Sequence, residues 1–130
     1  MKQNPKVGTT GELRFVADQK HATSLTEDGP AVLSTPWLIW FLEHAARDAL
    51  PPFLDDNEGS VGIHVDLQHL AATPLGQEVV CTARVIHVDG TLISFQFEAH
   101  DEDELIARGT HKRKVVRVDR FAAAVARKTK

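Results

Sequence analysis

Residues 35–50 read TPWLIWFLEHAARDAL, and this stretch decides the fold. Threonine is a favourable N-cap, proline fits the first helical position, and the Pro51-Pro52 pair stops a helix. The first half, residues 37–42, is apolar all round. A helix without a polar face must be surrounded by protein. We therefore predict one buried helix, capped by Thr35 and running to Leu50.

Strand patterns lie on both sides of this helix. An apolar–polar alternation precedes it, and four further segments with period two follow it, two of them joined by a tight Asp89-Gly90 turn. The predicted elements are a strand within 7–17, a loop over 18–32, strands near 60–69, 79–86, 93–99 and 105–118, a turn at 101–104 and a short helix over 119–127. All four later strands are consecutive, which predicts antiparallel pairing.

This order predicts an α+β fold in which a curved antiparallel sheet wraps around one central helix, the hotdog layout. The length fits one domain over residues 1–130. A chain of this size buries only about two-thirds of its unfolded surface, so pairing with a second copy would help. The chief alternative is a cone-shaped fold of the cystatin or nuclear-transport-factor type, which usually has more helix before its strands.

Composition excludes several functions. The formal charge of −3 argues against a nucleic-acid partner, which requires a basic surface. No apolar run is long enough for a membrane span, no secretory signal is visible, and Cys81 is the only cysteine, so we expect a cytoplasmic protein. Metal-ligand spacing, Gly-rich phosphate loops and a Gly-x-Ser-x-Gly elbow are absent from the sequence. Cys81 lies mid-strand and is expected in the core.

Glu43 is the first candidate for chemistry, because it directly follows the apolar half of the helix. A buried carboxylate is costly unless it is paired, and burial raises its pKa toward the range that suits acid–base catalysis. The alternative is an ordinary ion pair between Glu43 and Arg47, whose spacing of four residues suits one helix face. Both interpretations stay open.

His69 is the second candidate. Counting by two from Ile63 places Val65, Leu67 and His69 on the apolar face of one strand, toward the helix and Glu43. The alternative is a core histidine with its hydrogen bonds satisfied. A strand end directly after His69 would leave the ring partly exposed.

Thr35 is the third candidate, although capping alone explains a threonine before Pro36. A helix N-terminus also offers free N–H groups that stabilise an oxyanion, and because proline has none, Trp37 and Leu38 would donate them. Thr35 and Glu43 are about 12 Å apart along a helix axis, so a straight helix does not bring both to one atom.

Several of these residues also match a known family. Its motifs are Gly62, VDLQHLAATP at 65–74, AHD at 99–101 and GTHKR at 109–113, with Thr35 and Glu43 upstream. Over most of residues 7–128 the chain resembles the fluoroacetyl-CoA thioesterase-like group of hotdog proteins. The combination is fairly specific, whereas no single motif is.

The resemblance implies a homodimer that hydrolyses short acyl-CoA thioesters without a metal or cofactor, coenzyme A being part of the substrate. The family's catalytic threonine, glutamate and histidine correspond to Thr35, Glu43 and His69. Its active-site glycine corresponds to Gly62, and its arginine to Arg113, a candidate for contact with the CoA phosphates. In such dimers the site lies at the subunit interface, which eases the separation of Thr35 from Glu43.

One departure limits the resemblance. Residues 18–34 contain no phenylalanine, tryptophan or tyrosine, whereas the fluoroacetate-specific relative has lid phenylalanines there that are tied to fluorine selectivity. A broader small-acyl substrate is therefore expected, with Trp37 as a packing residue or as part of the acyl pocket. The functional alternative is a non-catalytic hotdog module that binds an acyl-CoA or a small apolar ligand. A hydratase is a weaker alternative, because no Asp/His hydratase motif is visible.

Overall fold

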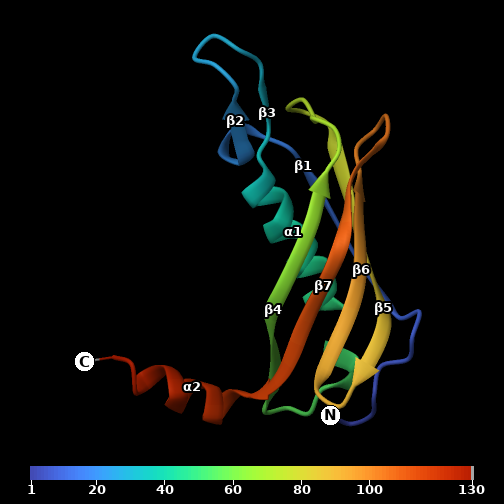
Figure 1. Cartoon of the computed structure of the whole chain (residues 1–130), viewed down its shortest axis with the longest axis vertical. Coiled ribbons are helices and arrows are strands. Elements are labelled where there is room, and N and C mark those ends of the chain that lie inside the picture. Colours follow the sequence, from blue (N-terminus) through green and yellow to red (C-terminus); the bar gives the residue numbers. More distant parts are fainter. Residues whose placement is uncertain (130) are drawn as a thin grey trace.

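The structure is a computed structural model that describes residues 1–129, and one curved sheet dominates it (Figure 1). Five antiparallel strands lie in the order β1-β5-β6-β7-β4. Their bounds are β1 (Thr10–Val16), β4 (Glu58–His69), β5 (Glu78–Asp89), β6 (Leu92–His100) and β7 (Leu105–Arg117). The predicted first strand and the four consecutive later strands are confirmed.

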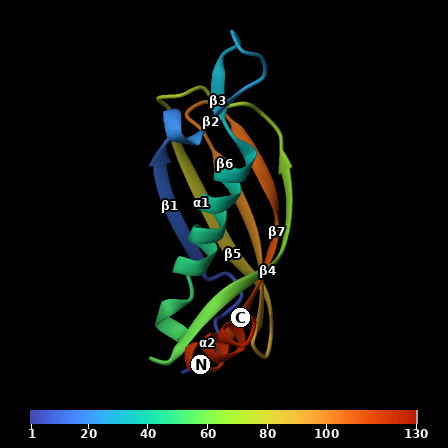
Figure 2. The same cartoon turned by 90° about the vertical axis from the view of Figure 1, so that its left-hand side faces the viewer.

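Helix α1 (Thr35–Asp48) lies along the concave face of the sheet (Figure 2). Its buried side chains meet the inward-facing residues of β5 and β6, which alternate with exposed polar ones. The helix supplies Leu38, Phe41, Leu42, Ala45 and Ala46 to this core, and the two strands supply Val79, Cys81, Ala83, Val85, Ile93, Phe95, Phe97 and Ala99. A curved sheet around one helix is therefore confirmed.

The ends and the burial of α1 differ from the prediction. Ser34 occupies the N-cap position and Thr35 is already helical, so the Thr35 hydroxyl does not cap the helix. The helix ends at Asp48, two residues before the predicted end, and a 3-10 turn, η2 (Pro51–Phe53), follows. Trp37 and Trp40 are 36% and 45% exposed, because the sheet curves around only one side of the helix.

The predicted loop over residues 18–32 contains regular structure. A 3-10 turn, η1 (Gln19–His21), precedes two short antiparallel strands, β2 (Ala22–Ser24) and β3 (Ala31–Leu33). This small hairpin projects beyond the end of the main sheet, above the start of α1 (Figure 1).

Strand β4 is an edge strand, and it carries a β-bulge between Gly62 and His64. Gly62 pairs with Arg113 and Val65 pairs with His111, so Ile63 is the extra residue. The prediction that Val65, Leu67 and His69 share the inner face is confirmed by their pairing with the inward residues of β7. The same prediction for Ile63 is wrong: the bulge removes it from that alternation, and it is 51% exposed.

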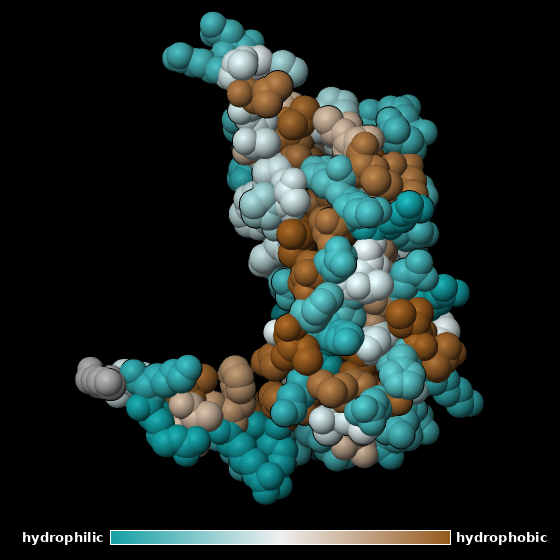
Figure 3. Space-filling view, in the orientation of Figure 1, coloured by the Kyte–Doolittle hydropathy of each residue, from teal (hydrophilic) through white to brown (hydrophobic). Residues whose placement is uncertain are grey.

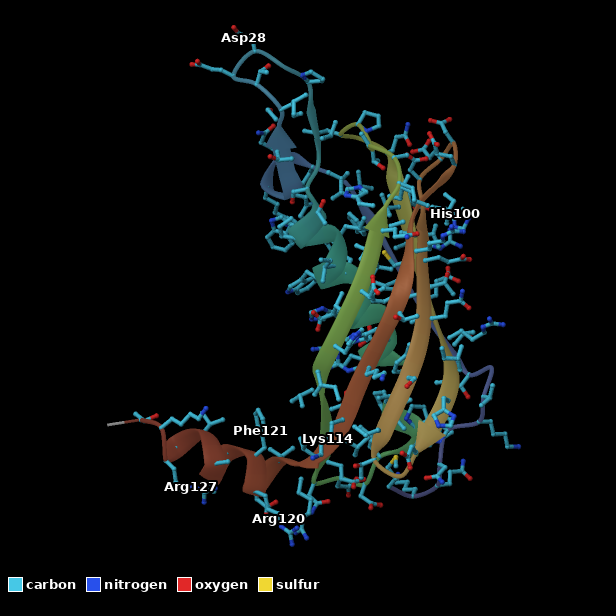
Figure 4. All side chains as sticks on the ribbon, viewed as in Figure 1. Asp28, His100, Lys114, Arg120, Phe121 and Arg127 are labelled. Carbon is cyan, nitrogen blue, oxygen red and sulfur yellow. The ribbon has the colours of Figure 1, made fainter. Side chains whose placement is uncertain are left out.

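Helix α2 (Val118–Ala126) confirms the predicted C-terminal helix and projects away from the sheet (Figures 1 and 3). None of its residues is buried, and Val118, Phe121 and Val125 are each about half exposed. Phe121 lies on the side of α2 opposite to Arg120 and Arg127 (Figure 4). No helix within residues 1–129 has both the length and the apolar character needed to cross a membrane.

Candidate active site

Thr35 and His69 meet at the N-terminal end of α1. The Thr35 hydroxyl Oγ1 lies 2.7 Å from Nδ1 of His69, which is the last residue of β4. Since Thr35 does not cap the helix, its hydroxyl is available for this bond. A hydroxyl and an imidazole at this distance form the nucleophile–base or donor–acceptor pair that acyl transfer uses.

The second ring nitrogen of His69, Nε2, is buried and has no hydrogen-bond partner among residues 1–129. Burial lowers the pKa of His69 from its ordinary value, and the backbone of Ala71 opposes this shift. The neutral imidazole is therefore favoured, which is the form that accepts a proton. An unpartnered buried nitrogen next to a hydroxyl is a feature that a purely structural histidine does not require.

A hollow of about 360 Å³ lies beside this pair. It is lined by Thr23, Val32, Leu33, Thr35, His69, Leu70, Ala71 and Ala72, so the β2–β3 hairpin forms one wall and the chain after β4 forms the other. Small apolar and hydroxyl side chains dominate the lining, which suits a small acyl group. Trp37 does not line it, and instead packs 5.0 Å from the ring of His21 and 6.2 Å from that of Phe41.

The helix N-terminus offers fewer donors than expected. The Leu38 N–H donates to the Ser34 carbonyl at 3.1 Å, so it is not available for an oxyanion. Of the two N–H groups predicted for this role, Trp37 is the one left.

Glu43 lies two turns further along α1, in a second polar cluster. Its Oε2 is 3.6 Å from Nη1 of Arg113 on β7, and its side chain is 35% exposed, so it is less buried than predicted. The alternative pair with Arg47 does not form, because the guanidinium of Arg47 faces Asp48 at 3.6 Å.

Arg113 is buried and almost fully bonded. Its Nε donates to Ser60 Oγ at 2.9 Å and its Nη2 donates to the Ser60 carbonyl at 3.0 Å. Desolvation lowers the pKa of Arg113, and the Glu43 carboxylate opposes this shift. Only 6% of its side chain is exposed, so contact with the CoA phosphates does not fit this residue. Its place beside Glu43 fits a role in holding that carboxylate.

Gly62 and His111 complete this second cluster. A Cβ on Gly62 would lie 2.9 Å from Glu43 Oε2 and 3.2 Å from Cε1 of His111, so only glycine leaves the carboxylate its present place. His111 is fully buried, and its Nε2 lies 3.2 Å from Nη1 of Arg113.

His111 and Ser60 were not predicted as site residues. Counting by two back from Val115 on β7 places His111 and Arg113 on one face, but Ser60 joins them only through the pairing of β4 with β7.

The structure therefore brings together Thr35 with His69, and Glu43 with Gly62 and Arg113, but it keeps the two groups apart on one chain. Their separation along α1 is about 12 Å. Among residues 1–129, no group of three or more His, Cys, Asp or Glu residues is arranged to hold a metal ion. Cys81 is buried, and burial raises its pKa to about 12, so its thiol is a core group as predicted.

Comparisons with known proteins find relatives over most of the chain. Residues 16–119 match the family described as fluoroacetyl-CoA-specific thioesterase. The chain is 38% identical over 100 residues to a fluoroacetyl-CoA thioesterase from Streptantibioticus cattleyicolor, which covers 77% of this chain and 72% of that protein.

Solved structures share the fold. The fluoroacetyl-CoA thioesterase FlK superposes with a TM-score of 0.90 at 31% identity, over 98% of this chain and all of FlK. A threonine-to-serine mutant of FlK in complex with acetyl-CoA gives a TM-score of 0.89 at 32% identity, over 97% of this chain and 100% of that one. A thioesterase superfamily member from Thermus thermophilus gives 0.87 at 27% identity, over 98% and 94%. The fold is thus that of the hotdog-like thioesterases.

Proposed function

The chain belongs to the fluoroacetyl-CoA-specific thioesterase family, whose members are thioester hydrolases, and from that premise we propose that it hydrolyses a short-chain acyl-CoA thioester to the free acid and CoA. The observation that carries this proposal is the 2.7 Å contact between Thr35 and His69 beside a small hollow. Thr35, Glu43 and His69 are the proposed catalytic residues, with Gly62 and Arg113 in support.

His69 is the proposed general base. Its neutral ring takes a proton from the Thr35 hydroxyl, or from a water held in the same place, as that oxygen attacks the thioester carbon. The C–S bond then breaks, and the proton on the imidazole passes to the departing CoA thiolate. The Trp37 N–H at the start of α1 would stabilise the oxyanion.

Glu43 is the proposed partner in the second half of the reaction. Its carboxylate, held against Arg113, would orient or deprotonate the water that releases the acid. On one chain it is too far from Thr35 to act on the same atom, so we propose that the site forms between two copies. An exposed edge strand supports this proposal, since β4 lies at the edge of the sheet and its residues Ile63 and Val65 are 51% and 37% exposed.

The proposed substrate is a small acyl group without selectivity for fluorine. The hairpin that walls the hollow carries Thr23 and Val32 and has no aromatic side chain that could close over the acyl group. No metal or redox cofactor takes part in the proposed reaction. CoA enters only as the thiol half of the substrate.

The test is hydrolysis of acetyl-, propionyl-, butyryl- and fluoroacetyl-CoA by the purified chain, followed by release of free thiol. We expect turnover of the small esters, and Glu43→Gln and His69→Ala should each lower kcat by about 10²- to 10⁴-fold. Sedimentation of the same samples gives the number of copies in the active particle, which we expect to be two.

A surface substitution far from both clusters, Glu98→Gln on the outer face of β6, is the matched control for Glu43→Gln. Full hydrolysis by both active-site variants would end the assignment. Thermal stabilisation by CoA esters without thiol release would instead identify a non-catalytic binding module.

A further inference from the structure

His111 is a buried histidine that the proposed reaction does not use. It lies on β7 with no exposed surface, and its ring stacks on Phe97 at 5.5 Å between centroids and 12° between planes. Both of its nitrogens have partners: Nδ1 lies 2.7 Å from the His64 carbonyl, and Nε2 lies 3.2 Å from Nη1 of Arg113.

These partners fix the tautomer of His111. A carbonyl only accepts hydrogen bonds, so Nδ1 carries the proton and donates it to His64. The guanidinium of Arg113 only donates, so Nε2 must present its lone pair. A protonated ring would instead place an N–H against the N–H of Arg113. Burial, and then the charge of Arg113, lower the pKa of His111, which agrees with a neutral ring.

This tautomer of His111 matters because it helps to fix the orientation of the Arg113 guanidinium. Ser60 holds Nε and Nη2 on one edge of the guanidinium, and Nη1 is left on the other. Nη1 has two N–H groups, of which one points to His111 and the other faces Glu43 at 3.6 Å. Without an acceptor at His111, the guanidinium could turn about its bonds to Ser60, and Nη1 would no longer be held toward Glu43.

We propose that His111 is a positioning residue for the hydrolytic site: as a neutral ring fixed by the His64 carbonyl, it aims Arg113 at Glu43. Gly62, which leaves room for the Glu43 carboxylate, and His64, whose carbonyl holds the ring of His111, flank the β4 bulge. The same irregularity of β4 therefore serves both Glu43 and the histidine that orients Arg113. The proposal rests on the proposed function, because it takes Glu43 as part of the hydrolytic site.

Three variants test it. His111→Phe keeps the ring and the stack on Phe97 but removes both nitrogens, whereas His111→Gln keeps an acceptor within reach of Arg113. Since a misplacement of about 1 Å costs on the order of 10²-fold in rate, we expect His111→Phe to lower kcat by about that factor with little change in KM. His111→Gln should recover most of kcat. Phe97→Leu, which removes the stack alone, is the control and should lower Tm without changing kcat.

The same substitutions in a Glu43→Gln background separate positioning from general damage. If His111 acts through Glu43, His111→Phe adds no further loss of kcat there. A wild-type kcat in His111→Phe, or an equal loss in His111→Phe and His111→Gln, would overturn the inference while leaving the hydrolase assignment intact.

Failure of the proposed function has a different signature, since the wild-type chain would then release no thiol. The positioning is still tested in that case by thermal unfolding of the two single variants and the double variant. Non-additive losses of stability for His111→Phe and Glu43→Gln support the contact chain through Arg113, and additive losses contradict it.

Discussion

Two polar clusters lie on the inner face of the same sheet, and they are built in opposite ways. The Thr35–His69 pair borders a hollow, and one of its nitrogens has no partner. The Glu43–Arg113–His111 cluster lies two turns further along α1, where Ser60, His64 and His111 bond the buried residues. The difference separates two tasks: an incompletely bonded group is free to react, and a buried, almost fully bonded one holds a charge in place.

The largest expected effect is at the open pair. Thr35→Val keeps the shape of the side chain but removes the hydroxyl, so His69 loses its 2.7 Å partner. We expect kcat/KM for acetyl-CoA to fall by about 10²- to 10⁴-fold, with Tm almost unchanged because Thr35 is exposed and caps nothing. Thr35→Ser retains the hydroxyl and serves as the control. A Thr35→Val enzyme as fast as Thr35→Ser would remove the hydroxyl from the mechanism.

The next effect is at the packed cluster, where one added methyl group is enough to displace the Glu43 carboxylate. Gly62→Ala places a Cβ 2.9 Å from the Glu43 carboxylate, so the carboxylate must move. We expect mainly a lower kcat, because the flexible end of Glu43 can move at little cost, and a loss of at most about 1 kcal/mol in the free energy of unfolding from the tight contact with His111. Chemical denaturation and thiol release measure the two effects.

Gly59→Ala is the matched control for Gly62→Ala, because in the same strand its Cβ meets only an ordinary contact 3.8 Å away, with Val118. If Gly59→Ala and Gly62→Ala lose the same stability and the same rate, the carboxylate is not the cause.

The smallest effect is on the pH profile, and it concerns His69 of the open pair. Burial lowers the pKa of His69 below its ordinary value of 6.5, so the ring stays neutral and basic into mildly acidic solution. The acid limb of kcat/KM should therefore have its midpoint below pH 6.5. The stability linked to the neutral ring is present above the unfolded pKa and is lost as pH falls through the folded pKa.

Thiol release between about pH 5 and 8, with Tm measured at each pH, checks this profile. An acid limb centred above pH 6.5 would contradict the assignment of His69 as the base, as would a limb that follows the loss of folded protein.

Much of the fold and part of the site could be predicted because they depend on local patterns. The apolar run before Glu43 predicted a central helix, and the alternation of Val65, Leu67 and His69 predicted their common face. The role of Thr35 could not be assigned in this way, because in the sequence a threonine before a proline fits a helix cap and a catalytic residue equally well. The contact with His69 depends on where a distant strand ends.

The support around Glu43 was less predictable for the same reason. Arg113 was expected near the site but at the CoA phosphates, because burial of an arginine is not visible in its own segment. Ser60 reaches it only through the register between β4 and β7, fifty-three residues apart in the chain. The exposed Trp37 and Trp40 differ from the prediction because the sequence shows how apolar a helix is, not how far a sheet extends around it.

The bulge in β4 also changes which residues of the strand face the inside of the sheet. Gly62 and His69 are seven positions apart in the chain, and in an unbroken strand an odd spacing sends two side chains to opposite faces. The single extra residue, Ile63, restores both to the inner face, and with them both polar clusters. Without Ile63, Gly62 and His69 would be an even number of positions apart, so deleting this residue would remove the bulge and a regular strand would still present both residues to the inner face. The active-site geometry thus depends on one bulged residue that compensates an odd spacing: the present sequence, paired as a regular strand, would turn one of the two clusters to the outside of the sheet.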